Sequence, residues 1–132
     1  MRKLHRLINA VYMDLYKPYG LRGSMVSILF IIGKRKGINQ KDIADALILD
    51  QSTMSRDLKK LVNKGWVTVN KGVDPRKSEL ALSKEGCILL EEISPLWHEL
   101  HTKVEGILGS FNIQNIDNIT EAIRSNLSDL KA

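Results

Sequence analysis

The sequence predicts a mainly α-helical domain with one small β-hairpin, in the order of a winged helix-turn-helix. Three observations support this prediction. Two short segments with helical periodicity, each opened by a capping residue, are separated only by Ile48 and Leu49. An alternating segment with a polar loop follows Gly65, as in a β-hairpin. Longer amphipathic segments lie on both sides of this region.

Length and composition limit the class of protein. A chain of 132 residues is expected to form a single domain. The single Cys87 excludes an internal disulfide and a multi-cysteine metal cluster. No apolar run approaches the roughly 20 residues of a membrane-spanning helix, and the N-terminus lacks a secretory apolar segment. We therefore expect a soluble, cytoplasmic protein.

Two helices are predicted before the central region. The segment from Leu4 to Tyr16 has one apolar face at helical spacing, and Pro18 and Gly20 end it. A second helix, from Ser24 to Arg35, is apolar on most sides. Such a helix is expected at the centre of the core.

The central region is predicted to be two helices with a tight link. Asn39 is the expected N-cap of a short helix that ends at Leu47. Asp50 is the expected N-cap of the next helix, which runs through Lys64 and ends at Gly65. A link of two residues forces the helices to cross steeply.

The segment after Gly65 is predicted to be a hairpin. Residues 66–70 and 78–82 alternate as strands do, and residues 71–77 form a polar loop between them. The residues expected to face each other across the hairpin are Val67, Val69, Leu80 and Leu82.

The remainder of the chain is predicted to be helical. Ser83 is the expected cap of a long helix that continues to about Leu108. Pro95 lies inside it, so we expect a kink there or a new helix capped by Ser94. Gly109 ends this helix, and isoleucines and leucines at helical spacing then predict a last amphipathic helix.

Positive charge is concentrated in the first two thirds of the chain. Residues 1–82 contain 16 Lys or Arg and 7 Asp or Glu, whereas residues 83–132 contain 4 and 8. Clustered positive charge is typical of a surface that binds a polyanion, because phosphate neutralisation releases counterions. The first region is therefore the expected place for nucleic-acid contacts.

The second central helix has two distinct faces. On a helical wheel Met54, Leu58 and Leu61 fall together and are expected to pack inward. The opposite face is polar and basic, with Ser52, Arg56, Lys59 and Asn63 flanked by Thr53, Ser55 and Lys60. Small hydroxyl residues let a helix approach the floor of a DNA groove, and an arginine one turn later reaches bases or phosphate. An ordinary solvated face is the competing interpretation, and the flanking capped helix and basic hairpin favour DNA.

Three motifs between Leu21 and Gly86 are typical of one family. They are the recognition segment Leu49-Asp50-Gln51-Ser52-Thr53-Met54-Ser55-Arg56, the strand entry Lys64-Gly65-Trp66-Val67, and the wing Asp74-Pro75-Arg76 followed by Leu80-Ala81-Leu82-Ser83-Lys84-Glu85-Gly86. In these motifs the chain resembles the MarR family of bacterial winged-helix transcriptional regulators. It departs from the family pattern at Ile48, where relatives often have Gly, at Arg22, where they often have a capping Thr, and at Ser78-Glu79 in the wing.

The resemblance implies a homodimer on double-stranded DNA. Residues 1–19 and 83–132 would form the dimerisation helices, and the winged lobes of residues 21–82 would span an inverted repeat. The resemblance also places Arg76 at the minor groove, with Asp74 bracing the wing. The full set of expected DNA contacts is Gln40, Lys41, Gln51, Ser52, Thr53, Ser55, Arg56, Lys59, Lys60, Lys71, Asp74, Arg76 and Lys77.

Three further groups of residues are candidate sites. The resemblance implies a small aromatic ligand near Tyr12, Tyr16, Met25 and Trp97, with plain packing as the competing interpretation. His98 and His101 share a helix face and are weak candidates for a metal site, since further ligands are missing at suitable spacing. We expect Cys87 to be a small buried residue rather than a redox sensor.

The expected function is that of a sequence-specific DNA-binding transcriptional regulator, a repressor that binds an inverted-repeat operator as a dimer and is relieved by a small ligand. No constellation of nucleophile, base and orienting group appears in the sequence, so we expect neither an enzyme nor a cofactor. The alternative is a winged-helix protein-interaction module, an adaptor or antagonist of another regulator without DNA binding of its own. Such a module would carry exposed apolar anchors on its recognition helix.

Overall fold

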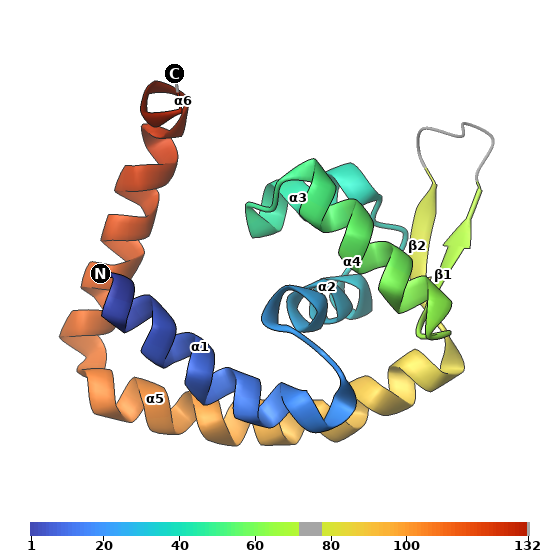
Figure 1. Ribbon diagram of the computed structural model, residues 1–132, viewed down its shortest axis with the longest axis horizontal. Helices are drawn as coiled ribbons and strands as arrows, with labels where there is room; N and C mark the ends of the chain where they lie inside the picture. The colour runs from blue at the N-terminus through green and yellow to red at the C-terminus, as the bar shows by residue number, and fades with distance from the viewer. Residues whose placement is uncertain (72–77, 132) are drawn as a thin grey trace. The chain divides into compact units, whose positions relative to one another are not determined.

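The computed structural model describes residues 1–71 and 78–131 and divides into two compact units, Met1–Leu96 and Trp97–Ala132. The first unit contains helices α1 to α4, the hairpin and the start of α5 (Figure 1). The second contains the rest of α5 and α6. No helix in the described part of the chain combines the length and the apolar character needed to cross a membrane.

The first helices follow the predicted bounds closely. Helix α1 spans Arg2–Tyr16, a 3₁₀ turn η1 spans Lys17–Tyr19, and α2 spans Gly23–Lys34. Gly20 ends the 3₁₀ turn with a φ of 68°, a conformation that favours glycine. Helix α2 buries five apolar side chains and packs against α1, α3, α4 and β2, so its predicted central position is confirmed.

Helices α3 (Gln40–Leu47) and α4 (Gln51–Asn63) form the helix-turn-helix. Both predicted N-caps are confirmed, because the Asn39 side chain accepts a hydrogen bond from the Asp42 amide at 2.8 Å and Asp50 accepts one from the Thr53 amide at 2.7 Å. The two helices pack on each other and on α2, and α4 ends beside the hairpin (Figure 1).

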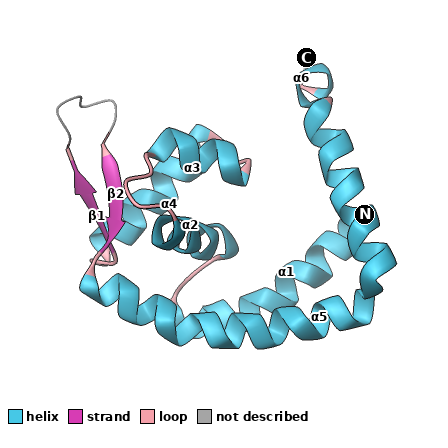
Figure 2. Ribbon diagram, turned by 180° about the vertical axis from the view of Figure 1, so that it is seen from behind, coloured by secondary structure: helices cyan, strands magenta, loops and turns pink. Residues whose placement is uncertain are grey.

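Strands β1 (Val67–Asn70) and β2 (Glu79–Leu82) pair antiparallel, as Figure 2 shows. The predicted facing pairs are confirmed, since Val67 lies opposite Leu82 and Val69 opposite Leu80. The backbone amide of Leu80 also donates to the Ile38 carbonyl at 3.0 Å, which ties the hairpin to the segment before α3. Val67 and Leu80 are buried, and the hairpin is thereby fixed to the core by one face.

Helix α5 (Lys84–Ser125) begins at the predicted cap, where the Ser83 hydroxyl accepts a hydrogen bond from the Gly86 amide at 3.0 Å. Gly86 lies so close to the hairpin that an added Cβ would be 2.1 Å from the Trp66 carbonyl oxygen. The predicted restart with Ser94 as a new cap is wrong, because the backbone stays helical through Pro95. The predicted end at Gly109 is confirmed, since this residue has a φ of 79° and a ψ of 158°.

The second unit, taken by itself, is helical on both sides of Gly109 and ends with the short helix α6 (Leu127–Leu130). Many of its large apolar residues are exposed, among them Ile107, Phe111, Ile119 and Ile123. This unit therefore presents an apolar surface that the described chain does not cover.

Candidate nucleic-acid interface

Helix α4 separates a buried face from an exposed polar face. Met54 and Leu61 are fully buried and Leu58 is nearly so, which confirms the predicted inward row. Gln51, Ser52, Ser55 and the basic residues of the opposite face are exposed. These basic residues are Arg56, Lys59 and Lys60. The arrangement gives solvent, or a ligand, access to a row of donors along one helix.

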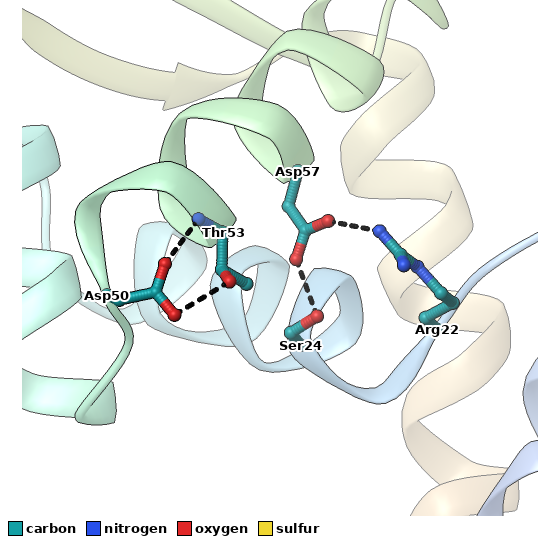
Figure 3. A network of polar contacts seen from close by, with 5 residues as sticks. All are labelled: Arg22, Ser24, Asp50, Thr53 and Asp57. Carbon is teal, nitrogen blue, oxygen red and sulfur yellow. Dashed lines mark hydrogen bonds and ion pairs between the residues drawn. The ribbon is translucent and has the colours of Figure 1, made fainter.

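The first turn of α4 is held by the Asp50 carboxylate (Figure 3). Besides the Thr53 amide, it accepts hydrogen bonds from the hydroxyls of Ser52 at 2.7 Å and Thr53 at 3.1 Å. The bond from the Thr53 amide is the largest of several that lower the pKa of Asp50 to about 2. The hydroxyl protons of Ser52 and Thr53 therefore point to Asp50, and the two side chains offer an external ligand their remaining acceptor sites.

Asp57 lies on the buried face of α4 and is fully inaccessible to solvent. Its carboxylate accepts a hydrogen bond from the Arg22 guanidinium at 2.6 Å and one from the Ser24 hydroxyl at 2.5 Å (Figure 3). Because a buried charge must be paired and hydrogen-bonded, these contacts fix α4 to the start of α2. This network was not predicted from the sequence, although a carboxylate within the inward row of Met54, Leu58 and Leu61 is a usable signal.

A second polar contact joins α3 to α4. The side-chain amide of Gln40 donates to the Ser55 hydroxyl oxygen at 2.9 Å. Lys41, next to Gln40, is exposed. The predicted contact residue Gln40 of α3 thus lies directly beside the predicted contact residue Ser55 of α4.

The hairpin contributes the last predicted contacts. Lys71, at the end of β1, is exposed. Asp74, Arg76 and Lys77 lie outside the described residues. At the base of the hairpin, the Lys64 ammonium lies 5.2 Å from the centre of the Trp66 ring, a cation–π distance.

The comparisons with known proteins agree with this architecture. The MarR family profile matches residues 24–78. An uncharacterized HTH-type transcriptional regulator of Bacillus subtilis, YwoH, is 33% identical over 89 residues, which are 67% of this chain and 65% of YwoH. Residues 24–78 of this chain form a MarR-family domain. The matched segment spans less than two thirds of the length of YwoH.

Solved structures of MarR-family regulators have the same fold. The M. tuberculosis transcriptional regulator MosR, crystallised in complex with DNA, has a TM-score of 0.80 at 24% identity over 94% of this chain and 92% of MosR. The Staphylococcus aureus MarR protein in complex with salicylate and kanamycin has a TM-score of 0.73 at 19% identity over 98% of this chain and 88% of that protein. The predicted fold class, a mainly α-helical winged helix-turn-helix, is therefore confirmed.

Two departures from the MarR family pattern have structural consequences. Ile48, in place of the frequent glycine, adopts the left-handed conformation with a φ of 55° and leaves its side chain about half exposed. The turn thus keeps the geometry for which glycine is suited. Arg22, in place of a capping threonine, makes no cap bond to α2 and pairs with Asp57 instead.

The candidate ligand residues are divided among three environments. Tyr12 and Tyr16 line a cavity of about 260 Å³ that also borders Arg22 and Ser24. Met25 is buried in the core and does not line this cavity. Trp97 belongs to the second unit, where its ring stacks on that of His101 with the centroids 4.4 Å apart. The structure therefore brings together two of the four predicted residues.

Cys87, His98 and His101 complete the predicted residues. Cys87 is exposed, so the expectation that it is buried is wrong, because it lines an open cavity together with Gly33 and Leu82. His101 lies 3.4 Å from a Glu105 carboxylate oxygen. Within residues 1–71 and 78–131, no three His, Cys, Asp or Glu side chains come together as metal ligands.

Proposed function

We propose that this protein is a sequence-specific DNA-binding transcriptional regulator that represses by binding an inverted-repeat operator as a homodimer. The observation that carries the proposal is the two-faced helix α4. Its polar face offers Ser52, Arg56 and Lys59 to solvent, while its other face is fixed by a buried apolar row and by Asp57. A rigid helix with exposed donors is the device by which helix-turn-helix proteins read the major groove.

The proposed interface extends from α3 to the wing. Gln40 and Lys41 on α3, the exposed face of α4, and Lys71 at the end of β1 would approach successive phosphates and base edges. The wing residues Arg76 and Lys77 would contact the flanking minor groove and backbone. Most of the affinity would come from Lys and Arg on phosphates, because counterion release dominates protein–DNA association.

The proposed dimer would use the exposed apolar residues at both ends of the chain. In α1, Leu7 is 66% exposed, and in the second unit Ile107 and Phe111 are 85% and 79% exposed. A second copy covering residues 1–19 and 83–132 would remove this apolar area from water. The two recognition helices would then be available for half-sites about one DNA turn, roughly 34 Å, apart.

We further propose a small aromatic ligand that relieves repression. The S. aureus MarR protein with the same fold binds salicylate. Here, the cavity beside Tyr12 and Tyr16 is the site of suitable chemistry in the first unit. Its volume of about 260 Å³ suits a single aromatic ring better than a drug-sized molecule, for which pockets of roughly 300 to 1,000 Å³ are usual.

The test is selection of bound fragments from a random DNA pool by the purified protein, followed by affinity measurements at several salt concentrations. We expect a palindromic motif with half-sites one helical turn apart and a steep loss of affinity with rising salt. The protein-interaction alternative predicts no enrichment even at low salt.

Variants at Arg56 refine this test. Arg56→Ala is expected to weaken operator binding by about 1 to 3 kcal/mol and to relax the preference at one base pair. Arg56→Lys is the matched control, since it keeps the charge but cannot form a bidentate contact. It should retain the salt dependence and lose the base preference. Arg76→Ala is expected to weaken binding to all sequences alike, and equal losses on all sequences for both arginines would refute the role of Arg56.

A further inference from the structure

The first turn of α4 carries two hydroxyls whose protons are already used. The Ser52 hydroxyl donates to one carboxylate oxygen of Asp50 at 2.7 Å, and the Thr53 hydroxyl donates to the other at 3.1 Å (Figure 3). The pKa of Asp50 is lowered to about 2, chiefly by the hydrogen bond from the Thr53 amide, so this carboxylate is ionised at neutral pH and can only accept. Because a hydroxyl has one proton, Ser52 and Thr53 present only lone pairs to any further partner.

These acceptors lie on the face of α4 that the proposed DNA complex uses. Asp50 and Ser52 are exposed, and Ser52 lies one turn before Arg56 on the same side of the helix. The Arg56 guanidinium carries only N–H donors. The exposed face of α4 therefore begins with acceptors and continues with donors.

The charge of Asp50 determines which part of DNA this turn can approach. A helix N-terminus ordinarily attracts phosphate through its unpaired N–H groups. Here the Thr53 amide is already bonded to the Asp50 carboxylate, and the negative charge of that carboxylate repels phosphate. The first turn of α4 is therefore suited to base edges rather than to the DNA backbone.

Base edges differ in what they offer to an acceptor. In the major groove cytosine and adenine each present an exocyclic amine, which donates, whereas guanine presents acceptors and thymine presents an acceptor and a methyl group. A surface of acceptors therefore bonds to cytosine or adenine and brings lone pairs against lone pairs at guanine or thymine. A serine whose proton is not held would bind either set, since a hydroxyl can donate or accept.

We propose that Asp50 sets the base preference of the recognition helix, because by holding the protons of Ser52 and Thr53 it makes this turn select a cytosine or an adenine at the base that Ser52 faces. Asp50 is a positioning residue, since it acts through the Ser52 hydroxyl. This inference rests on the proposed function as a DNA-binding regulator and names part of the operator that this function requires. One base contact of this kind commonly discriminates by about 5-fold to 150-fold in affinity.

The experiment begins with the operator that the full chain selects from a random DNA pool. Each cytosine or adenine of its half-sites is replaced in turn by an analogue without the exocyclic amine, 2-pyrimidinone for cytosine and purine for adenine, and the dissociation constant is measured. At one position the loss of affinity should be about 5-fold to 150-fold for the wild type and absent for Ser52→Ala, which has no acceptor to lose. Using the same duplexes for both proteins cancels any effect of the analogue on the DNA itself.

The decisive variant is Asp50→Gly, which removes the carboxylate and releases both hydroxyl protons. Glycine is itself a favourable N-cap, so α4 should still begin at the same residue. The selected motif should broaden at the position identified with Ser52→Ala, where guanine or thymine should now be tolerated, and should stay the same elsewhere. Asp45→Asn is the matched control, because it removes an exposed negative charge from α3 and leaves the first turn of α4 intact. It should leave the motif unchanged, and circular dichroism with thermal melting establishes that each variant is folded.

The outcomes separate the two proposals. An unchanged motif in Asp50→Gly, or an operator in which no cytosine or adenine shows a loss that depends on Ser52, overturns the role of Asp50, while the selected palindrome still supports the proposed function. Failure of the wild-type protein to select any DNA refutes the proposed function, and this inference with it.

Discussion

The helix-turn-helix and the helices at the two ends of the chain use their apolar residues in opposite ways. In α2 to α4 the large apolar residues are mostly buried, as Ile28, Ile43 and Met54 illustrate with no exposed surface. In α1 and in the second unit, side chains of the same kind are exposed, as Leu7 and Ile107 illustrate. One region buries its apolar residues within a single copy, whereas the other presents exposed apolar faces, which we propose a second copy covers.

The largest expected effect comes from breaking the exposed apolar face of the second unit. Phe111→Asp with Ile119→Asp places two charges on it. We expect the dimer to dissociate and affinity for a two-half-site operator to fall by about 10² to 10⁴, because the second half-site is no longer bound intramolecularly. Sedimentation velocity and fluorescence anisotropy measure the two effects.

The control adds the same charge at polar exposed positions of the same unit, Gln114→Asp with Ser128→Asp. This protein should remain dimeric. Binding to a single half-site should be alike in both variants, since the helix-turn-helix is intact in each. A dimer that survives Phe111→Asp with Ile119→Asp would contradict the assignment of this face to the partner.

Features that depend on residues close together in the sequence could be predicted, whereas contacts between distant residues could not. The caps at Asn39, Asp50 and Ser83 are local chemistry between residues three apart, and the inward row of α4 is periodic, so both were predicted correctly. The pair of Arg22 with Asp57 joins residues 35 positions apart. No local rule identifies such a partner, and only the fold brings the two side chains together.

Exposure was harder to predict than periodicity. Cys87 is expected to be buried because it lies one turn into an apolar helix, but it is exposed at a cavity that Gly33 and Leu82 also line. For Pro95 the sequence predicts a kink or a new helix capped by Ser94, and the new start is wrong because the backbone stays helical through Pro95 as far as the predicted break at Gly109. Whether Cys87 is buried depends on how α5 packs on its neighbours, and composition alone does not determine that packing.

The next largest effect is a loss of stability when the polar network of Arg22, Ser24 and Asp57 between α2 and α4 is broken. Arg22→Ala leaves the buried Asp57 carboxylate with the Ser24 hydroxyl as its remaining side-chain donor within the described part of the chain. We expect a loss of about 1 to 3 kcal/mol in the free energy of unfolding, the usual cost of an under-satisfied buried polar group. Urea denaturation measures it.

Arg22→Gln with Asp57→Asn is the comparison for this loss. Most of the stability should return in the paired variant, because neither side chain is then charged and the desolvation cost of the ion pair is removed. If Arg22→Ala were as stable as the wild type, the network would have no role in holding α4.

A smaller change, an increase in stability, is expected at the turn between α3 and α4. Ile48→Gly should raise the free energy of unfolding by up to about 1 kcal/mol. A left-handed conformation costs an L-residue roughly 1 to 2 kcal/mol, and the greater freedom of glycine in the unfolded chain offsets part of the gain. Thermal melting is the measurement, and Ile48→Val, which stays β-branched, should show no gain.

The smallest effect concerns the cap of α4 and depends on pH. Because the pKa of Asp50 is lowered from 3.8 to about 2, its ionised form is favoured in the folded state. Its contribution to stability is therefore complete above about pH 4 and is lost as the pH falls through about 2. The difference in melting temperature between the wild type and Asp50→Asn isolates this contribution from the other carboxylates. The difference should shrink between pH 4 and pH 2, with Asp45→Asn as the control for loss of an exposed charge in the preceding helix. A difference that stayed constant over this interval would mean that the first turn of the recognition helix is not held by the Asp50 carboxylate.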